Sequence, residues 1–279
     1  MNGTERPIID TFSRHIVPIY LLLEKDGEPK HPVWFTAFLL RVRGNYLLAT
    51  AGHCLDDVET MERKGWKITK ARLMDALSFD AKFLDPIPFD YHLSMPCRPL
   101  KQDENDYGLL ILSDLTAAAL LANQVLPISE AAWECDMGEP ELYFVTGILG
   151  VGSTVTLERA HLKAVSALVQ HVPECPPCFN HVVLRWYGKV VPTDQIKSLE
   201  GMSGGPVFAM KYVNGRYKYW LHGIQSAQSP RFPMEPYIAV NLAQPMAAFL
   251  AEVAEGKHAD WLEATEDKKP FSGSVPVSK

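Results

Sequence analysis

Short apolar runs separated by turn residues fill the chain up to about residue 240, and this pattern restricts the fold more than any other feature. The runs have the length of strands, and β-branched and aromatic residues, which favour extended backbone, are common in them. Gly44 and Asn45, between two such runs, predict a β-hairpin. Many short strands at fairly even spacing indicate a barrel or a sandwich. The clearest runs are residues 33–42, 46–50, 108–112, 142–146, 154–157, 182–187, 206–210, 217–221 and 237–240.

Two segments depart from the strand pattern. Residues 115–123 are rich in Ala and Leu and predict either a short helix or a connector between two halves. Residues 244–255 have a proline near the start and Gly256 just past the end, an arrangement typical of a helix. The polar stretch 257–279 that follows is expected to be a mobile tail.

Composition excludes several classes of protein. The 279 residues suffice for one large domain or for two small ones around a shared cleft, and a content of 47% hydrophobic and 22% charged residues predicts a soluble globular chain. The net charge of -6 argues against nucleic acid or an anionic membrane as a partner. No apolar stretch is long enough to span a bilayer, and residues 16–23 predict a strand and turn rather than a signal peptide. Five cysteines are an odd, sparse set for a secreted protein, so we expect a cytoplasmic location.

Three short motifs carry residues suited to nucleophilic catalysis. Residues 50–54 read Thr-Ala-Gly-His-Cys and follow a predicted strand. Asp106 stands at the head of the apolar run 108–112, and Ser203 lies in a Gly-rich turn that leads into another strand. A serine hydroxyl becomes a good nucleophile when a histidine takes its proton and an acid orients that histidine. Flanking glycines let two backbone N–H groups face one point and stabilise an oxyanion.

These motifs resemble those of the trypsin/chymotrypsin-like serine peptidase family. Thr-Ala-Gly-His-Cys is similar to the family's Thr-Ala-Ala-His-Cys. Residues 201–206, Gly-Met-Ser-Gly-Gly-Pro, resemble Gly-Asp-Ser-Gly-Gly-Pro and, still more, the Gly-Asn-Ser-Gly-Gly-Pro of bacterial members. The order His, Asp, Ser is that of the family, and residues 221–226 resemble its substrate-pairing strand. The resemblance extends from about residue 16 to residue 250.

The resemblance implies a role for each matching residue. His53 would be the general base, Asp106 its orienting acid and Ser203 the nucleophile, with the amides of Gly201 and Ser203 as the oxyanion hole. Asp103 and Glu104 are nearby alternatives to Asp106, but only Asp106 immediately precedes the apolar strand. An edge strand for the substrate would run through Ser226, Ala227 and Gln228.

The same resemblance implies an all-β fold. It consists of two antiparallel six-stranded β-barrels, residues 12–118 and 119–256, with the active site between them and a helix at the C-terminal end. The reaction requires no metal and no organic cofactor.

One position differs from the family pattern, and two more are expected to set specificity. Met202 stands where secreted members have the Asp that pairs with a newly cut N-terminal amine, so activation by that ion pair is not expected. The site is either preformed or completed by a partner, a cofactor or a loop movement. Lys197 and Ser198 fall near the base of the specificity pocket, where a lysine would disfavour Arg or Lys at P1 and favour an acidic or small residue.

Other residues allow competing interpretations. Cys175 and Cys178 have the spacing of a zinc or redox site, with His171 and His181 close in sequence, although an incidental loop is the preferred interpretation. Cys54 has no upstream cysteine to pair with and is expected to be a free buried thiol.

The sequence therefore predicts an intracellular, bacterial serine endopeptidase that cleaves a protein or peptide substrate and is controlled by a regulatory partner or by a narrow choice of substrate. The first alternative is a binding module of the same fold that holds a peptide without cutting it. A weaker alternative is a structural zinc or redox protein built on the two close cysteines.

Overall fold

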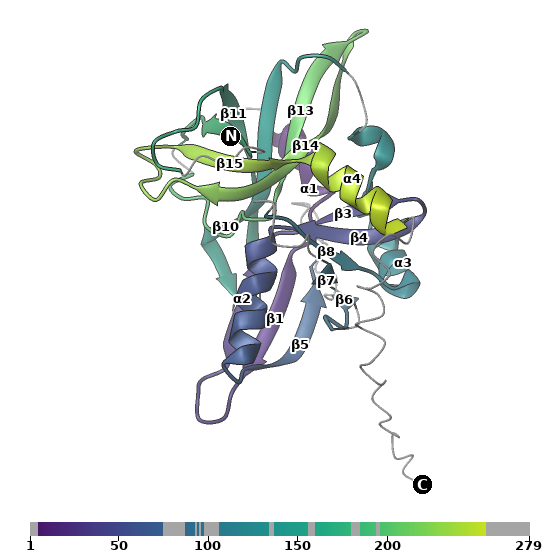
Figure 1. Ribbon diagram of the computed structural model, residues 1–279, viewed down its shortest axis with the longest axis vertical. Coiled ribbons are helices and arrows are strands. Elements are labelled where there is room, and N and C mark those ends of the chain that lie inside the picture. The colour runs from purple at the N-terminus through teal and green to yellow at the C-terminus, as the bar shows by residue number, and fades with distance from the viewer. Residues whose placement is uncertain are drawn as a thin grey trace.

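A computed structural model describes residues 5–74, 87–92, 94, 96–97, 106–133, 137–155, 160–179, 185–193 and 196–254 of the chain. The protein is mostly β-structure, and helix α4 (Ala243–Ala254) closes its described part, as expected (Figure 1). Within these residues no helix is both long enough and apolar enough to cross a membrane. The predicted tail 257–279 lies outside the described residues.

The N-terminal half contains two sheets. One has the order β2-β1-β5-β6, built from β1 (Ile19–Glu24), β2 (His31–Phe35), β5 (Lys67–Leu73) and β6 (Ile87–Pro88). The other has the order β7-β8-β4-β3-β9, built from β3 (Phe38–Val42), β4 (Asn45–Thr50), β7 (Pro96–Cys97), β8 (Gly108–Ile111) and β9 (Ile128–Ser129). The antiparallel pair β3–β4 confirms the predicted hairpin.

Both sheets of the N-terminal half contribute to one apolar core. It contains fully buried side chains of β1, β3, β4, β5 and β8, among them Leu21, Leu39, Leu48, Leu73 and Leu110. Burial of such side chains is the main favourable term in folding. The six-stranded barrel expected for this half stays a prediction, because its described strands form two sheets over a shared core.

The C-terminal half is a closed ring of six antiparallel strands in the order β10-β11-β12-β15-β14-β13. Val145, Val169, Val207 and Val240 point into the ring and are almost completely buried. The first two residues of the apolar run predicted at 154–157 are the last two residues of the long strand β10, and residues 156–157 lie outside the described residues. The ring strands are β10 (Leu142–Val155), β11 (Ala160–Val172), β12 (Arg185–Val190), β13 (Pro206–Val213), β14 (Arg216–Gln228) and β15 (Tyr237–Leu242).

The described part of the chain also contains four α-helices and a short 3-10 helix. The Ala/Leu-rich segment forms α3 (Asp114–Ala122), begun by Ser113, whose hydroxyl accepts the amide of Thr116 at 3.2 Å. The domain boundary predicted at residue 118 falls inside this helix. A short 3-10 helix, η2, covers Glu130–Ala132. Two further helices, α1 (Glu5–Ser13) and α2 (Gly52–Arg63), occur where we had not predicted helices of this extent.

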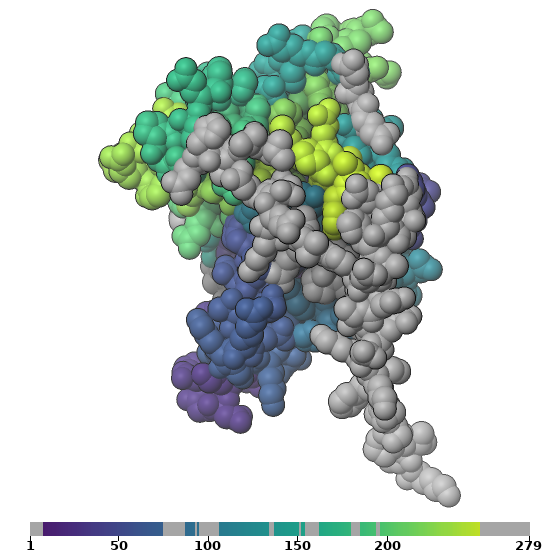
Figure 2. All heavy atoms as spheres, in the orientation of Figure 1, coloured from purple at the N-terminus to yellow at the C-terminus, as the bar shows by residue number. Residues whose placement is uncertain are grey.

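A third apolar cluster joins the two halves. Phe12 of α1 stacks on Phe208 of β13 with ring centroids 4.5 Å apart, and it meets Tyr219 of β14 edge-on at 5.2 Å. The same cluster includes Phe38 of β3 and Met246 of α4. In Figure 2 the blue segment that holds α2 lies below the green strands of the ring. The two halves are therefore joined by a continuous buried core rather than by a linker alone.

Candidate active site

His53 lies in the first turn of α2, immediately after β4. The residue that precedes the helix, Ala51, is extended, with φ -72 and ψ 141. A Cβ at Gly52 would lie 3.1 Å from Oδ1 of Asp106 and 3.2 Å from the carbonyl of Tyr107. Gly52 therefore lets the start of α2 lie close against the segment before β8, where the predicted acid stands.

Asp106 holds His53 through two hydrogen bonds. Its Oδ1 accepts the backbone N–H of His53 at 2.7 Å, and its Oδ2 lies 2.7 Å from Nδ1 of the imidazole. The pairing of Thr50 with Gly108 on β4 and β8 brings these two residues together. Because a carboxylate only accepts, Nδ1 carries a proton, and in the neutral ring Nε2 is left as the acceptor. The other two acids weighed for this role, Asp103 and Glu104, lie outside the described residues.

The environment of His53 favours its charged form. Burial lowers the pKa of His53, but the hydrogen bond that its ring donates to Asp106 opposes this, as does the neighbouring sulfur of Cys54. The net effect raises the pKa above the ordinary value of 6.5. An imidazole with a raised pKa is a stronger base, which suits proton removal from a hydroxyl once the ring is neutral.

Ser203 lies in residues 199–205, here named the nucleophile loop, which packs directly on the turn that carries His53. Gly204 has φ +87, and a Cβ there would collide with Thr50 Oγ1 and with the carbonyl of Thr36. Two backbone hydrogen bonds of 2.9 Å, Gly204 N to Gln225 O and Gln225 N to Gly205 O, tie the loop to β14. Glycine at position 204 is therefore required for the close approach of the two halves at the site.

Cys54 stands beside both His53 and Ser203. Its Sγ lies 3.7 Å from Nε2 of His53 and 3.9 Å from the carbonyl oxygen of Ser203. The thiol is free and buried, as the sequence predicted. In this conformation the half-buried hydroxyl of Ser203 bonds to no other described residue, and catalytic hydrogen bonds commonly tighten only when substrate binds.

The carbonyl groups of the nucleophile loop are directed into the protein. Thr36 Oγ1 donates to Gly201 O at 2.7 Å. The other acceptors are Leu199 O for Met202 N at 2.9 Å, Glu200 O for Gly150 N at 2.6 Å, and Met202 O for Gly205 N at 2.8 Å. The C=O and N–H of one trans peptide point in opposite directions. The peptides that end in the amides of Gly201 and Ser203 therefore present their N–H groups away from the protein.

Two amides of this loop remain available. Leu199 and Glu200 donate to Gln228 Oε1 at 2.8 Å and to Ser198 Oγ at 3.1 Å. The amides of Met202, Gly204 and Gly205 have backbone acceptors. Within the described part of the chain, Gly201 and Ser203 are the residues of this loop whose N–H groups have no acceptor. Two such donors flanking a serine suit an oxyanion.

Met202 anchors the nucleophile loop in the core of the ring. Its side chain is completely buried, at 0% exposure, among apolar residues that include Val145 and Val207. A Cβ at Gly147 would lie 3.2 Å from Met202 Cα and Cβ, so β10 passes directly against the loop at this point. The position that holds an aspartate in secreted family members is therefore filled here by an uncharged, close-packed side chain.

The residues expected to bind substrate lie beside the nucleophile loop. Ser226 is buried and donates to Ala239 O at 3.2 Å, whereas Ala227 and Gln228 are half-buried. Pairing of β13 with β14 ends at Pro206 and Ile224, so residues 226–228 have β15 on one side and no paired strand on the other within the described chain. That open edge is able to receive an extended peptide.

The specificity residues differ in exposure. Lys197 is exposed and Ser198 is half-buried, between the buried side chains of Ile196 and Leu199. The side chain of Gln228 braces the loop through its hydrogen bond to Leu199 N. The P1 preference expected from Lys197 and Ser198 stays a prediction.

The pair Cys175 and Cys178 shows no set of metal ligands among the described residues. Cys175 and Cys178 are free, half-buried thiols, and the sulfur of Cys175 approaches the carbonyls of Pro176 at 3.6 Å and Phe179 at 3.7 Å. Among the residues with described positions, no three His, Cys, Asp or Glu side chains gather in the manner of a metal site. His181 lies outside that set.

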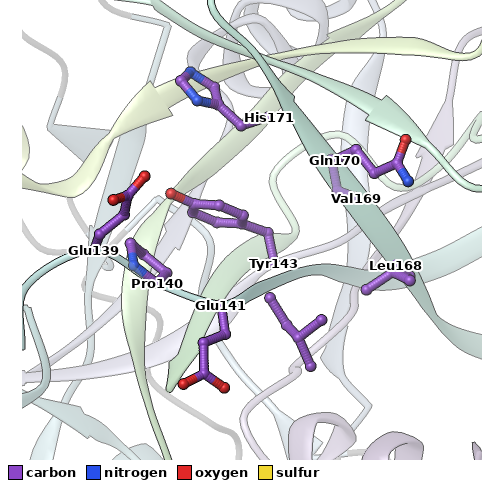
Figure 3. A pocket seen from close by; sticks show the side chains of 9 residues that line it. Glu139, Pro140, Glu141, Tyr143, Leu168, Val169, Gln170 and His171 are labelled. Carbon is purple, nitrogen blue, oxygen red and sulfur yellow. The ribbon is translucent and has the colours of Figure 1, made fainter. Parts of the chain in front are cut away.

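A hollow of about 360 Å³ lies between the start of β10 and the end of β11. Figure 3 shows the ring of Tyr143 at its centre, with the carboxylate of Glu139 and the imidazole of His171 around it. None of the predicted catalytic or substrate-binding residues lines it.

No protein-family model matches the chain, and no curated protein matches it. A function is therefore inferred from the three motifs and from the contacts among His53, Asp106 and the nucleophile loop. One residue of this arrangement, Thr36, was not predicted, because its sequence neighbourhood is an ordinary strand and only the fold brings it to Gly201.

Proposed function

We propose that the protein is a serine endopeptidase of the trypsin-like kind. The observation that carries the proposal is the joint placement of the Asp106–His53 pair and of a loop whose Gly201 and Ser203 amides are free to donate. Asp106 orients the imidazole, and the free amides offer two donors to a developing negative charge. A structural turn has no need of both features at one place.

The chemistry proceeds through an acyl-enzyme. Ser203 Oγ attacks the peptide carbonyl while Nε2 of His53 takes the hydroxyl proton, and the carbonyl oxygen becomes an oxyanion bound by the two amides. When the tetrahedral adduct collapses, the C–N bond breaks and His53 gives the proton to the leaving amine. Water then attacks the ester, with the same base, and restores the serine.

The substrate in this proposal is an extended peptide or protein segment. It would add as a strand to the open edge of residues 226–228, which lies next to the nucleophile loop. The exposed cation of Lys197 supports the proposed selection against Arg or Lys at P1. The two-barrel architecture, a cytoplasmic location in a bacterium and control by a partner protein complete the proposal and rest on the sequence.

A peptide-binding module without activity is the second candidate. The observation that favours it is the sulfur of Cys54, which occupies the neighbourhood of Nε2, the atom that must receive the proton of Ser203. In a binding module the strand edge would still hold a peptide, but the serine would not react.

Labelling with a fluorophosphonate separates the two candidates, because only an activated serine attacks the phosphorus. We expect wild-type protein to be labelled at Ser203, and labelling to be lost in Ser203→Ala and His53→Ala. Ser129→Ala, which removes an exposed serine of β9 outside the nucleophile loop, serves as the matched control and should retain labelling. Absence of labelling in the wild type would favour the binding module, and labelling that persists in Ser203→Ala would refute the assignment of the nucleophile.

A further inference from the structure

Thr36 lies between β2 and β3 in the N-terminal half, and its side chain reaches the nucleophile loop of the C-terminal half. The residue is completely buried. Its Oγ1 donates to Gly201 O at 2.7 Å and accepts Ile148 N of β10 at 3.0 Å. Its own carbonyl accepts Thr50 Oγ1 at 2.7 Å. The Thr36 hydroxyl thus connects the ring with the loop that carries the serine, and the Thr36 carbonyl adds the strand before the histidine turn.

The two peptides around Gly201 are each held by a hydrogen bond. Thr36 binds the carbonyl of Gly201, and Gly150 N binds the carbonyl of Glu200. The bond from Gly150 N to Glu200 O turns the Gly201 N–H outward. The bond from Thr36 to Gly201 O holds the peptide between Gly201 and Met202, so that this peptide does not rotate and allow the preceding one to flip. Gly201 has φ +88, a conformation easily reached by glycine, so its own backbone offers little resistance to rotation. The external hydrogen bonds must therefore set its orientation.

We propose that Thr36 is a positioning residue that keeps the Gly201 amide turned toward the oxyanion. It takes the place of the ion pair that Met202 is unable to make, and this inference rests on the proposed function. A neutral hydroxyl needs neither a free N-terminal amine nor a particular protonation state. The oxyanion hole is therefore formed without cleavage of the chain.

The test uses three variants in fluorophosphonate labelling, whose phosphoryl oxygen occupies the oxyanion hole. Thr36→Val keeps the shape and removes the hydroxyl, and we expect its labelling rate constant to fall about ten- to a hundredfold. Thr36→Ser restores the hydroxyl and should return the rate to within about threefold of wild type. Thr146→Val removes another fully buried hydroxyl, which bonds Ser166 and not the nucleophile loop, and should label at the wild-type rate.

Amide hydrogen exchange at Gly150 gives a second readout that does not depend on activity. Its N–H is protected while it donates to Glu200 O, so Thr36→Val should exchange this proton at least about tenfold faster, and Thr36→Ser and Thr146→Val should not. If Thr36→Val does not fold, Thr36→Ala provides the same loss of the hydroxyl with less steric demand.

The outcomes distinguish the two proposals. A wild type that is never labelled, with Gly150 deprotected only when the Thr36 hydroxyl is removed, would refute the peptidase and leave the positioning role intact. Wild-type labelling together with unchanged rates and unchanged Gly150 protection in Thr36→Val would refute the positioning role alone. If the labelling rate fell equally in Thr36→Val and Thr146→Val, general destabilisation would explain the fall, and the inference would be overturned.

Discussion

Replacing Met202 by aspartate tests whether the nucleophile loop is anchored by apolar burial or awaits a cationic partner. The side chain is completely buried in the core of the ring, and its replacement by a smaller polar group loses about 2 kcal/mol or more of packing and transfer free energy. A carboxyl group without a cation in that core must also stay protonated, because ionised carboxylates are very unfavourable in apolar surroundings.

The cost of that protonation depends on pH in a calculable way. The ordinary pKa of an aspartate is near 3.9, so pH 7 lies about three units above it. Keeping the buried carboxyl protonated at pH 7 therefore costs about 4 kcal/mol. Near pH 4 this cost is almost absent. We therefore expect Met202→Asp to lower the free energy of unfolding by about 6 kcal/mol at pH 7 and by about 2 kcal/mol at pH 4. The larger figure is a major fraction of the stability of a typical domain, about 5–15 kcal/mol.

Urea unfolding followed by tryptophan fluorescence measures these differences. Met202→Asn has nearly the shape of the aspartate variant but does not titrate, so its loss should be the same at both pH values. Met202→Leu preserves an apolar side chain of similar volume and should cost less than about 1.5 kcal/mol. If Met202→Asp proved as stable as Met202→Asn at pH 7, a cation would have to reach position 202, and the argument for anchoring by burial would be refuted.

Two further predictions concern the base and the loop. Labelling of Ser203 should rise with pH through the raised pKa of His53, because the base must be neutral, and Asp106→Asn should move the midpoint to lower pH and slow labelling by roughly a thousandfold or more. Because a raised folded-state pKa stabilises the protein fully only below the ordinary value of 6.5, Asp106→Asn should destabilise the protein more at mildly acidic pH than at alkaline pH in urea unfolding. An unchanged pH profile would contradict this pairing. Gly204→Ala should cost more than about 3 kcal/mol of stability, because positive φ and collision with backbone and hydroxyl atoms add together. Gly215→Ala, with φ +81 but open space around it, should cost only about 1 kcal/mol, and equal losses would show that the collision is unimportant.

The sequence by itself determined the features that depend on near neighbours. The hairpin of β3 and β4 and the C-terminal helix follow from local periodicity and turn residues, whereas the Ala/Leu-rich segment allowed either a helix or a connector, and the fold shows helix α3. His53, Asp106 and Ser203 were identified because each stands in a short motif, and the structure brings His53 and Asp106 into contact. The extent of α2 was not predicted, because the histidine motif gave no sign that a helix begins at Gly52.

Only the tertiary structure decided how the loop around Ser203 is held. Thr36 lies far from Gly201 along the chain, and nothing in an ordinary strand sequence shows that its hydroxyl reaches the other half of the molecule. The same is true of Gly150 and of Gln228, whose contacts with the loop exist only after the ring has closed. Met202 was interpreted from the sequence as a residue unable to form an ion pair, and only the fold showed that its side chain is fully buried, since burial is a property of the whole core and not of a motif. The reacting groups are thus encoded locally, whereas their orientation depends on hydrogen bonds between residues that are brought together only by folding.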